Sequence, residues 1–337
     1  MKDLVPESIK LLPEQAKQAW RETSKLKIPR KYGLVKNIFI LGMGGSGFAP
    51  EMVKFLYRDE LTISCEVYHG YGLPRYVNGN SLLLLSSYSG TTDEVLDAGK
   101  QGLAKKLKMI GITRGDRLAK FMRQNNIPGY IFDEKNNPSK QPRLGSGYMV
   151  IGIIGLLKKS GLFKIGNDQV EQAIKFIGKR QKALLIDGKN IARLLKNKIP
   201  IIIVAEFLEG NGRALRNQVN ENAKNFAEYQ TIPELNHHLM EGLKFPESNK
   251  KNLIFLFIKS KLYLQENQKR FKVTKEVVRK NKIKCLELML MGKTKLEQSL
   301  ELFSLGSYLS YYLSKLNRVD PQKIPWVDYF KKKLAAS

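Results

Sequence analysis

The stretch at residues 82–95 constrains the fold more strongly than any other part of the chain. It begins with four consecutive leucines at 82–85, which predict a strand buried on both faces. A loop rich in serine and threonine follows. A helix comes next, for which Thr91 is the predicted N-cap and Glu94 completes a capping box. A buried strand that leads through a polar loop into a helix is typical of a parallel α/β sheet.

The loop between this strand and this helix is suited to a phosphate group. Free backbone N–H groups and the positive end of the helix dipole point into it, and Ser87, Ser89, Thr91 and Thr92 add hydroxyl groups. An ordinary polar turn is the alternative, but four hydroxyls and a glycine are more than a helix cap requires. The loop therefore predicts a small ligand that carries a phosphate dianion.

The strand and helix pattern predicts an α/β fold with two similar domains, at 1–160 and 161–337, each a mostly parallel sheet flanked by helices on both faces. In the first domain, besides the stretch above, we expect strands at 36–41, 63–68, 109–112 and 130–132, and helices at 12–28, 48–57, 116–124 and 147–158. In the second we expect strands at 199–205, 253–258 and 285–290, and helices at 168–196, 211–227, 274–280 and 295–316.

The net charge of +27 raises the question of a nucleic-acid partner, since 58 lysines and arginines face only 31 acidic residues. The lysines are scattered over almost every predicted surface helix, however, and no RNA-recognition or zinc-finger signature is present. We therefore expect no specific nucleic-acid partner. A basic field of this kind would also attract anionic metabolites.

The lack of targeting signals and the cysteine usage predict a cytoplasmic protein without membrane association. No apolar run approaches the ~18 residues needed to span a bilayer, and residues 1–7 contain acids and lack the apolar core of a signal peptide. Cys65 and Cys285 lie far apart and form no motif, which fits a reducing compartment.

A second candidate phosphate loop lies after the first predicted strand. Gly42, Gly44 and Gly47 match the dinucleotide fingerprint G-x-G-x-x-G, and Ser46 adds a hydroxyl group. The acidic residue that a dinucleotide site requires would be Glu66, which lies inside the next strand and not at its carboxyl end. Two phosphate-type loops on one sheet therefore favour a single sugar phosphate over a dinucleotide.

Longer motifs carry a specific resemblance. Residues 42–47 together with 86–94 resemble the sugar-isomerase (SIS) domain family. Residues 142–148, 220–224 and 233–238 resemble the bifunctional phosphoglucose/phosphomannose isomerases, and the similarity covers nearly the whole chain. It implies a cofactor-free homodimer that interconverts glucose 6-phosphate and fructose 6-phosphate through an enediol, with mannose 6-phosphate as a further candidate substrate.

Aldose–ketose isomerisation needs a base near C1 and C2, an acid/base pair to open the ring, and a cation for the developing oxyanion. Glu221 lies on a predicted helix and is the candidate base, with a pKa that partial burial would raise. The resemblance implies that His237 opens the ring with Lys331 of the terminal helix as its partner, that the histidine can come from the neighbouring subunit, and that Arg143 faces the enediolate.

Without the resemblance these residues have plainer interpretations. A glutamate in a helix is usually solvated, a single histidine is as often structural as catalytic, and an arginine after a proline turn is commonly held in a salt bridge. His69 is expected at a strand end without a role. For the substrate, the resemblance implies binding by the following residues: Gly45, Ser46, Ser87, Ser89, Thr92 and Gln322.

Gln322 stands where the family has a small threonine that leaves room at C2, so we expect glucose 6-phosphate to be preferred over mannose 6-phosphate. The chain has only three histidines, two of them adjacent, and this does not make a metal site. The competing hypothesis is a non-catalytic SIS regulator that binds a sugar phosphate. A regulator would need an effector domain, and the ~30 residues before the first strand are too short for a DNA-binding head of the usual size.

Overall fold

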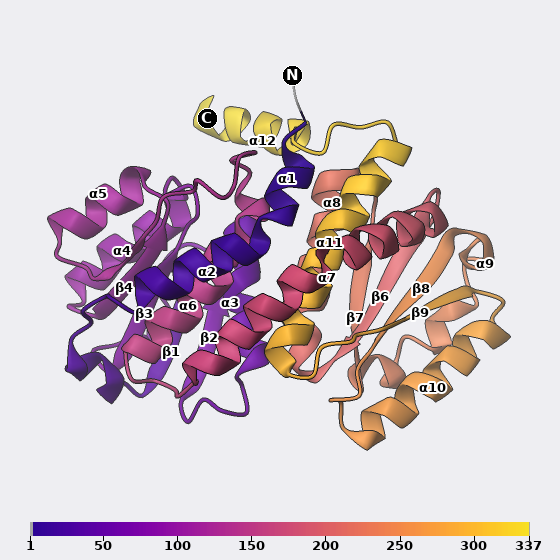
Figure 1. Cartoon of the computed structure of the whole chain (residues 1–337), viewed down its shortest axis with the longest axis horizontal. Coiled ribbons are helices and arrows are strands. Elements are labelled where there is room, and N and C mark those ends of the chain that lie inside the picture. The colour runs from indigo at the N-terminus through magenta and orange to yellow at the C-terminus, as the bar shows by residue number, and fades with distance from the viewer. Residues whose placement is uncertain (1–2, 337) are drawn as a thin grey trace.

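The computed structural model describes residues 3–336 and contains two parallel sheets that lie side by side (Figure 1). The first has the strand order β2-β1-β3-β4-β5 and the second β7-β6-β8-β9, and all strand pairs are parallel. The strands are β1 (Asn37–Gly42), β2 (Ser64–Tyr68), β3 (Ser81–Ser86), β4 (Lys108–Thr113), β5 (Gly129–Ile131), β6 (Ile199–Ala205), β7 (Glu228–Ile232), β8 (Leu253–Lys259) and β9 (Lys284–Met289).

Strand β3 confirms the prediction from the four leucines, because every residue in it is buried. Leu82 and Leu84 belong to the main core with helices α3 (Gly44–Leu56) and α6 (Ser146–Lys159). Leu83 and Leu85 belong to a second apolar cluster that includes Val95 of α4 (Asp93–Ala104). Alternate leucines thus face opposite helix layers, as the period of a strand requires.

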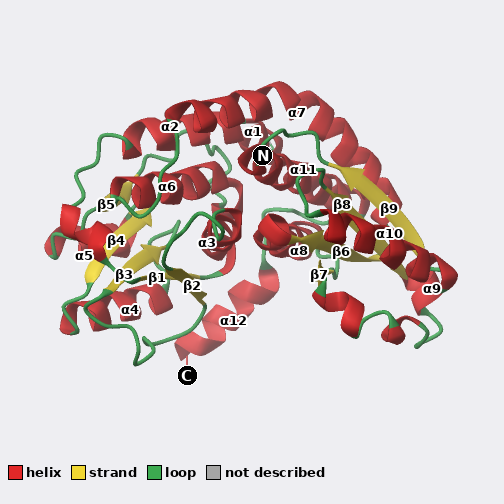
Figure 2. Ribbon diagram, turned by 90° about the horizontal axis from the view of Figure 1, so that it is seen from below, coloured by secondary structure: helices red, strands yellow, loops and turns green. Residues whose placement is uncertain are grey.

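The two halves share one core. Buried apolar residues of α2 (Leu12–Thr23), α7 (Asn167–Leu195) and α11 (Lys295–Leu316) belong to the same cluster as those of both sheets. Figure 2 shows these long helices as a layer that spans both sheets. The other helices are α1 (Val5–Lys10), α5 (Asp116–Gln124), α8 (Glu209–Ala223), α9 (Asn249–Asn252), α10 (Gln265–Lys280) and α12 (Pro325–Ala336).

Helix α12 lies apart from this core. In Figure 2 it crosses the side of the molecule where the two sheets face each other. Its apolar side chains are largely exposed, with Trp326 at 79% and Phe330 at 60% of their full surface. Within residues 3–336, no helix combines the length and apolar character that a membrane span requires.

Several predicted boundaries were wrong. The helix expected at 12–28 ends at Thr23. The helix expected from residue 48 already begins at Gly44, inside the glycine motif. Helix α8 ends at Ala223, because the next residue takes up a left-handed conformation. Strand β7 was missed because it is a mostly half-buried edge strand, and the first turns of α10 because they are polar.

Candidate functional site

The glycine loop and the hydroxyl loop lie side by side at the carboxyl edge of the first sheet. Gly42 at the end of β1 is in register with Ser86 at the end of β3. The two loops are joined by hydrogen bonds, because the Tyr88 backbone N–H donates to Ser46 Oγ (2.7 Å) and Ser86 Oγ donates to the Ser46 carbonyl (3.1 Å). The structure therefore brings the two predicted phosphate loops together.

The hydroxyl groups of the second loop bond to one another. Ser87 Oγ lies 2.7 Å from Thr92 Oγ1, and Ser89 Oγ lies 3.0 Å from Thr91 Oγ1. The predicted capping box was wrong: the N-cap of α4 is Thr92, and its side chain makes no cap hydrogen bond. Because the hydroxyls are engaged with each other, no side-chain oxygen of the N-cap residue covers the positive end of α4.

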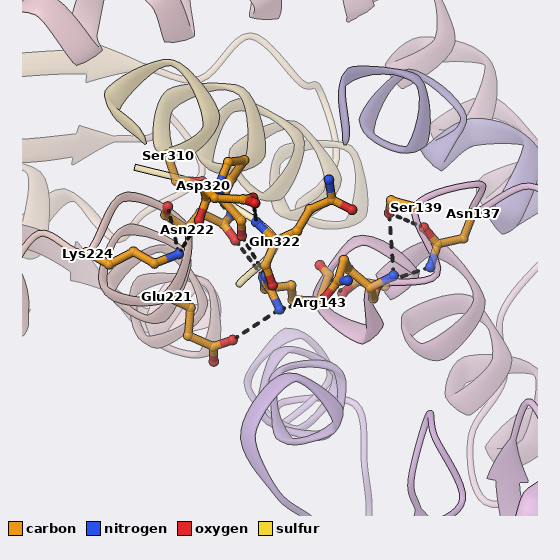
Figure 3. A network of polar contacts seen from close by, with 12 residues as sticks. Asn137, Ser139, Arg143, Glu221, Asn222, Lys224, Ser310, Asp320 and Gln322 are labelled. Atoms are coloured by element: carbon orange, nitrogen blue, oxygen red, sulfur yellow. Dashed lines mark hydrogen bonds and ion pairs between the residues drawn. The ribbon is translucent and has the colours of Figure 1, made fainter. Parts of the chain in front are cut away.

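Arg143 is the most deeply buried charged residue of the site, with 3% of its surface exposed. It lies in a 3₁₀ turn (Pro142–Leu144) and reaches from the first half of the chain into the second (Figure 3). Its guanidinium donates four hydrogen bonds, to Asn222 Oδ1 (2.6 Å), Gln141 Oε1 (3.1 Å), the Pro321 carbonyl (2.6 Å) and the Gln322 carbonyl (3.0 Å).

Glu221 lies two residues before the end of α8 and faces Arg143. Its Oε2 is 3.7 Å from Arg143 Nη1, and 29% of its side chain is exposed. Burial raises the pKa of Glu221 above its ordinary value, while Arg143, Lys224 and Lys331 oppose that rise in this order. A half-buried carboxylate beside three cations has the environment of a general base.

The phosphate loops and the Arg143–Glu221 pair are adjacent. A Cβ atom placed on Gly45 would lie 3.3 Å from the backbone nitrogen of Arg143, so the glycine loop packs directly against the arginine turn. Lys331 on α12 is exposed and lies close enough to influence the pKa of Glu221. One site therefore combines helix N-termini, hydroxyl groups, a buried guanidinium and a carboxylate.

The side chains of two further predicted site residues, His237 and Gln322, do not contact the Arg143–Glu221 pair within the described chain. His237 is exposed on a 3₁₀ turn after β7, and no hydrogen bond or ion pair between described residues joins it to Arg143 or Glu221. Gln322 contacts Arg143 through its backbone carbonyl. Figure 3 shows its side-chain amide pointing away from Glu221.

The sequence did not identify Asn222, which binds Arg143, or Lys224, which binds the nearby segment at Asp320. Asn222 accepts from Arg143 and donates through Nδ2 to Ser310 Oγ of α11 (2.9 Å). Lys224 Nζ donates to the Asp320 carbonyl (2.6 Å). Both residues lie in the motif at 220–224. Their position beside Glu221 in that motif was the available signal.

His69 has contacts that its predicted lack of a role did not anticipate. Its Nδ1 lies 2.5 Å from the Gly42 carbonyl and its Nε2 lies 3.1 Å from Glu51 Oε1. The same carboxylate oxygen accepts from Arg213 Nη1 of α8 (2.6 Å). His69 thus packs under the glycine loop and takes part in a polar link between α3 and α8.

A surface hollow of about 410 Å³ lies between α4 and α5, lined by residues that include Tyr71, Asp97 and Lys120. Neither Arg143 nor Glu221 lines it, but Asp93 at the start of α4 does, so the hollow lies beside the hydroxyl loop and apart from the Arg143–Glu221 pair. Among residues 3–336, no group of three or more histidine, cysteine or acidic residues could hold a metal ion.

Parallel sheets flanked by helices, with two phosphate-type loops at one sheet edge, are the features of an SIS-domain protein. The model of the bacterial phospho-glucose isomerase C-terminal SIS domain matches residues 186–334. The bifunctional phosphoglucose/phosphomannose isomerase of Caldicellulosiruptor bescii is 31% identical over 98% of both chains. The chain belongs to the bifunctional phosphoglucose/phosphomannose isomerase family.

Two further comparisons extend this result. The protein of the same name from Thermoplasma acidophilum is 28% identical over 90% of this chain and 91% of its own. A solved structure of a hypothetical protein from Thermus thermophilus superposes with a TM-score of 0.76 at 14% identity, covering 98% of this chain and 90% of that one. The latter likeness concerns the fold alone.

Proposed function

We propose that the protein is a metal-free aldose–ketose isomerase that interconverts glucose 6-phosphate and fructose 6-phosphate, and also accepts mannose 6-phosphate. The observation that carries the proposal is the Glu221 carboxylate 3.7 Å from the buried Arg143 guanidinium, beside two phosphate-type loops. Glu221 takes a proton from C1 of the ketose or C2 of the aldose and returns it to the other carbon of the enediolate.

Arg143 stabilises the enediolate oxygen in this proposal. A guanidinium has five N–H donors, and four hydrogen bonds from Arg143 are directed to protein oxygens. The separation of 3.7 Å between Nη1 and Glu221 is too long for a hydrogen bond. The remaining donor on Nη1 is therefore available to a substrate oxygen held next to the base.

The phosphate binds between the glycine and hydroxyl loops in this proposal, at Gly45, Ser46, Ser87, Ser89 and Thr92. Ser46 Oγ already accepts from the Tyr88 backbone N–H, so its hydroxyl hydrogen can be donated to a phosphate oxygen. The N-termini of α3 and α4 add their backbone N–H groups and the positive ends of their dipoles.

His237 opens the sugar ring from a neighbouring subunit, with Lys331 as its partner, and the working form is a homodimer. Two observations support this: His237 is exposed and separate from Glu221 within one chain, and α12 presents exposed apolar side chains. The proposal also includes domains at 1–160 and 161–337 and a cytoplasmic location. The location is supported by the two cysteines, both of which are free.

The deciding experiment is a coupled assay for glucose 6-phosphate formation from fructose 6-phosphate. Activity that persists in EDTA is expected, whereas loss on chelation and recovery with zinc would contradict the metal-free mechanism. Absence of turnover together with tight fructose 6-phosphate binding would instead favour the non-catalytic regulator. The relatives reported above are named as isomerases, which supports the enzyme.

The source of the histidine can be tested by mixing two inactive variants, His237→Ala and Glu221→Gln, under conditions that exchange subunits. If His237 acts across the interface, the mixed dimer contains one site with both groups intact, and activity returns. If His237 acts in its own subunit, every site in the mixture lacks one group, and activity stays at the level of the separate variants.

A further inference from the structure

Two cations from opposite halves of the chain hold three consecutive carbonyl groups. Arg143 donates to the carbonyls of Pro321 and Gln322, and Lys224 donates to that of Asp320. These carbonyls belong to the connector, residues 317–324, which leads from α11 to α12. Figure 3 shows both cations converging on this segment. The connector is thereby fixed between the two halves immediately before the helix that carries Lys331.

Lys224 occupies a backbone position that normally favours glycine. It follows the last residue of α8 with φ 50° and ψ 36°, in the left-handed region. Lys106 after α4 and Lys282 after α10 have similar φ angles of 53° and 59°. Both lysines are exposed, and among residues 3–336 their backbone N–H groups bond only to the preceding turns, at Leu103 and Arg279, so they provide matched backbone controls for Lys224.

We propose that Lys224 is a positioning residue, which fixes the connector through the Asp320 carbonyl and so places α12 and Lys331 beside Glu221. The inference rests on the proposed isomerase function and names a residue that acts through others. Lys224 lies three residues after Glu221 on the same helix end. Its ammonium group therefore links the helix that carries the base to the segment that carries the second cation.

Lys224 also acts on Glu221 through charge. The groups that face Glu221 are Arg143, Lys224 and Lys331, and all three oppose the rise in its pKa that burial causes. Burial and Arg143 lower the pKa of Lys224 itself, while Asp320 and Glu221 oppose this. Removing the ammonium group should raise the pKa of Glu221. Because a base works only when deprotonated, the acid limb of the pH–rate profile should then move to higher pH.

The test compares three glycine variants of the full chain: Lys224→Gly, Lys106→Gly and Lys282→Gly. Glycine fits the left-handed backbone, so all three should unfold at the same or a slightly higher temperature than the unmodified protein. Only Lys224→Gly should lose turnover, by roughly tenfold or more, because small displacements of reacting groups reduce rates strongly. Its acid limb should also shift to higher pH, and Lys224→Arg should restore part of the rate.

Two results would overturn the inference. One is a Lys224→Gly variant with unchanged kcat, KM and pH profile. The other is a loss of rate without a pH shift and without rescue by arginine, which would indicate a merely structural role.

A further measurement does not depend on activity and so separates this inference from the proposed function. Trypsin can cleave the connector after Lys323, which is exposed. Lys224→Gly should accelerate this cleavage, whereas Lys282→Gly should not. Equal cleavage rates would refute the role of Lys224 even if the protein proved to be no isomerase, and faster cleavage in an inactive protein would refute only the proposed function.

Discussion

The two sheets repeat the same strand-loop-helix units but use them differently. In the first sheet, the N-termini of α3 and α4 face the glycine and hydroxyl loops, and the N-cap residues of both helices make no side-chain cap bond. In the second, Glu206 Oε1 occupies the start of α10, where it accepts from the Leu264 N–H (2.9 Å) and from Asn267 Nδ2 (2.7 Å). A protein carboxylate thus fills the position that corresponds to the phosphate site proposed for the first sheet.

The starts of α3 and α8 also differ: the start of α3 faces the glycine loop, whereas the start of α8 packs against α3. A Cβ atom on Gly210, in the first turn of α8, would lie 2.5 Å from the backbone of Glu51 in α3, so this end of α8 is buried against the first half. Glu221, the proposed base, lies at the other end of α8. A helix C-terminus is negative, which favours the cations Arg143 and Lys224 that lie near it.

The largest effect should come from Glu221→Gln, which removes the proposed base in the second half. Glutamine keeps the shape of the side chain but cannot accept the carbon-bound proton, so kcat should fall by ~10²–10⁴ or more. Fructose 6-phosphate binding should remain nearly intact, as measured by calorimetry. Glu276→Gln, on the exposed face of α10, is the matched control. A Glu221→Gln variant that keeps most of its turnover would mean that another group is the base.

A serine pair compares the loops of the two sheets directly. Ser87 follows β3 and accepts from the Gly90 N–H (3.1 Å), while Ser260 follows β8 and accepts from the Leu262 N–H (2.9 Å). Ser87→Ala should raise KM for the sugar phosphate about tenfold with little change in kcat, because a charged hydrogen bond is worth ~1.5–3 kcal/mol in both ground and transition states. Ser260→Ala should leave KM unchanged. Equal changes in KM from the two substitutions would show that the loops of the two sheets do not differ in substrate binding.

Glu206→Gln tests whether the carboxylate at the start of α10 is structural. Glutamine can still accept one hydrogen bond but loses the charge that favours a helix N-terminus, so we expect a loss of about 1 kcal/mol in the free energy of unfolding. KM and kcat should not change. Denaturant titration and the isomerase assay measure the two quantities, and an altered KM would show that the second sheet also takes part in substrate binding.

The smallest effect should come from Gln322→Thr. The unmodified protein should use glucose 6-phosphate better than mannose 6-phosphate, and threonine should narrow the ratio of their kcat/KM values by roughly two- to fivefold. We expect a small change because the amide of Gln322 points away from Glu221 and must turn to reach a substrate. Equal efficiency of the unmodified protein towards both epimers would refute a role for Gln322 in this preference.

Much of the fold could be predicted from short-range patterns. The four leucines of β3 and the long apolar run of α11 are local signals, and both elements lie where they were expected. The half-buried edge strand β7 and the polar start of α10 carry no such signal. Their conformation depends on pairing with β6 and on packing against β8, which the local sequence does not reveal.

The site could be predicted only in part, for a similar reason. Motifs identified Arg143 and Glu221, and the structure brings these two together. The partners of Arg143 could not be predicted, because the carbonyls of Pro321 and Gln322 are backbone groups that carry no residue-specific signature. For the hydroxyl loop, the sequence identified the residues but not their contacts. The hydroxyl groups bond to one another, and the expected capping box does not form.

The hydrogen bond between Arg143 and the Pro321 carbonyl also bears on how the chain matures during synthesis. The two residues are separated by 178 positions. At ~5–20 residues per second, a ribosome needs roughly 10–35 s to pass from one to the other. During this interval the glycine and hydroxyl loops can form, but the guanidinium lacks its two carbonyl acceptors in the connector. Under the proposed function, a chain interrupted before the connector would keep the loops proposed to bind phosphate but would lack two of the contacts that hold Arg143 beside Glu221.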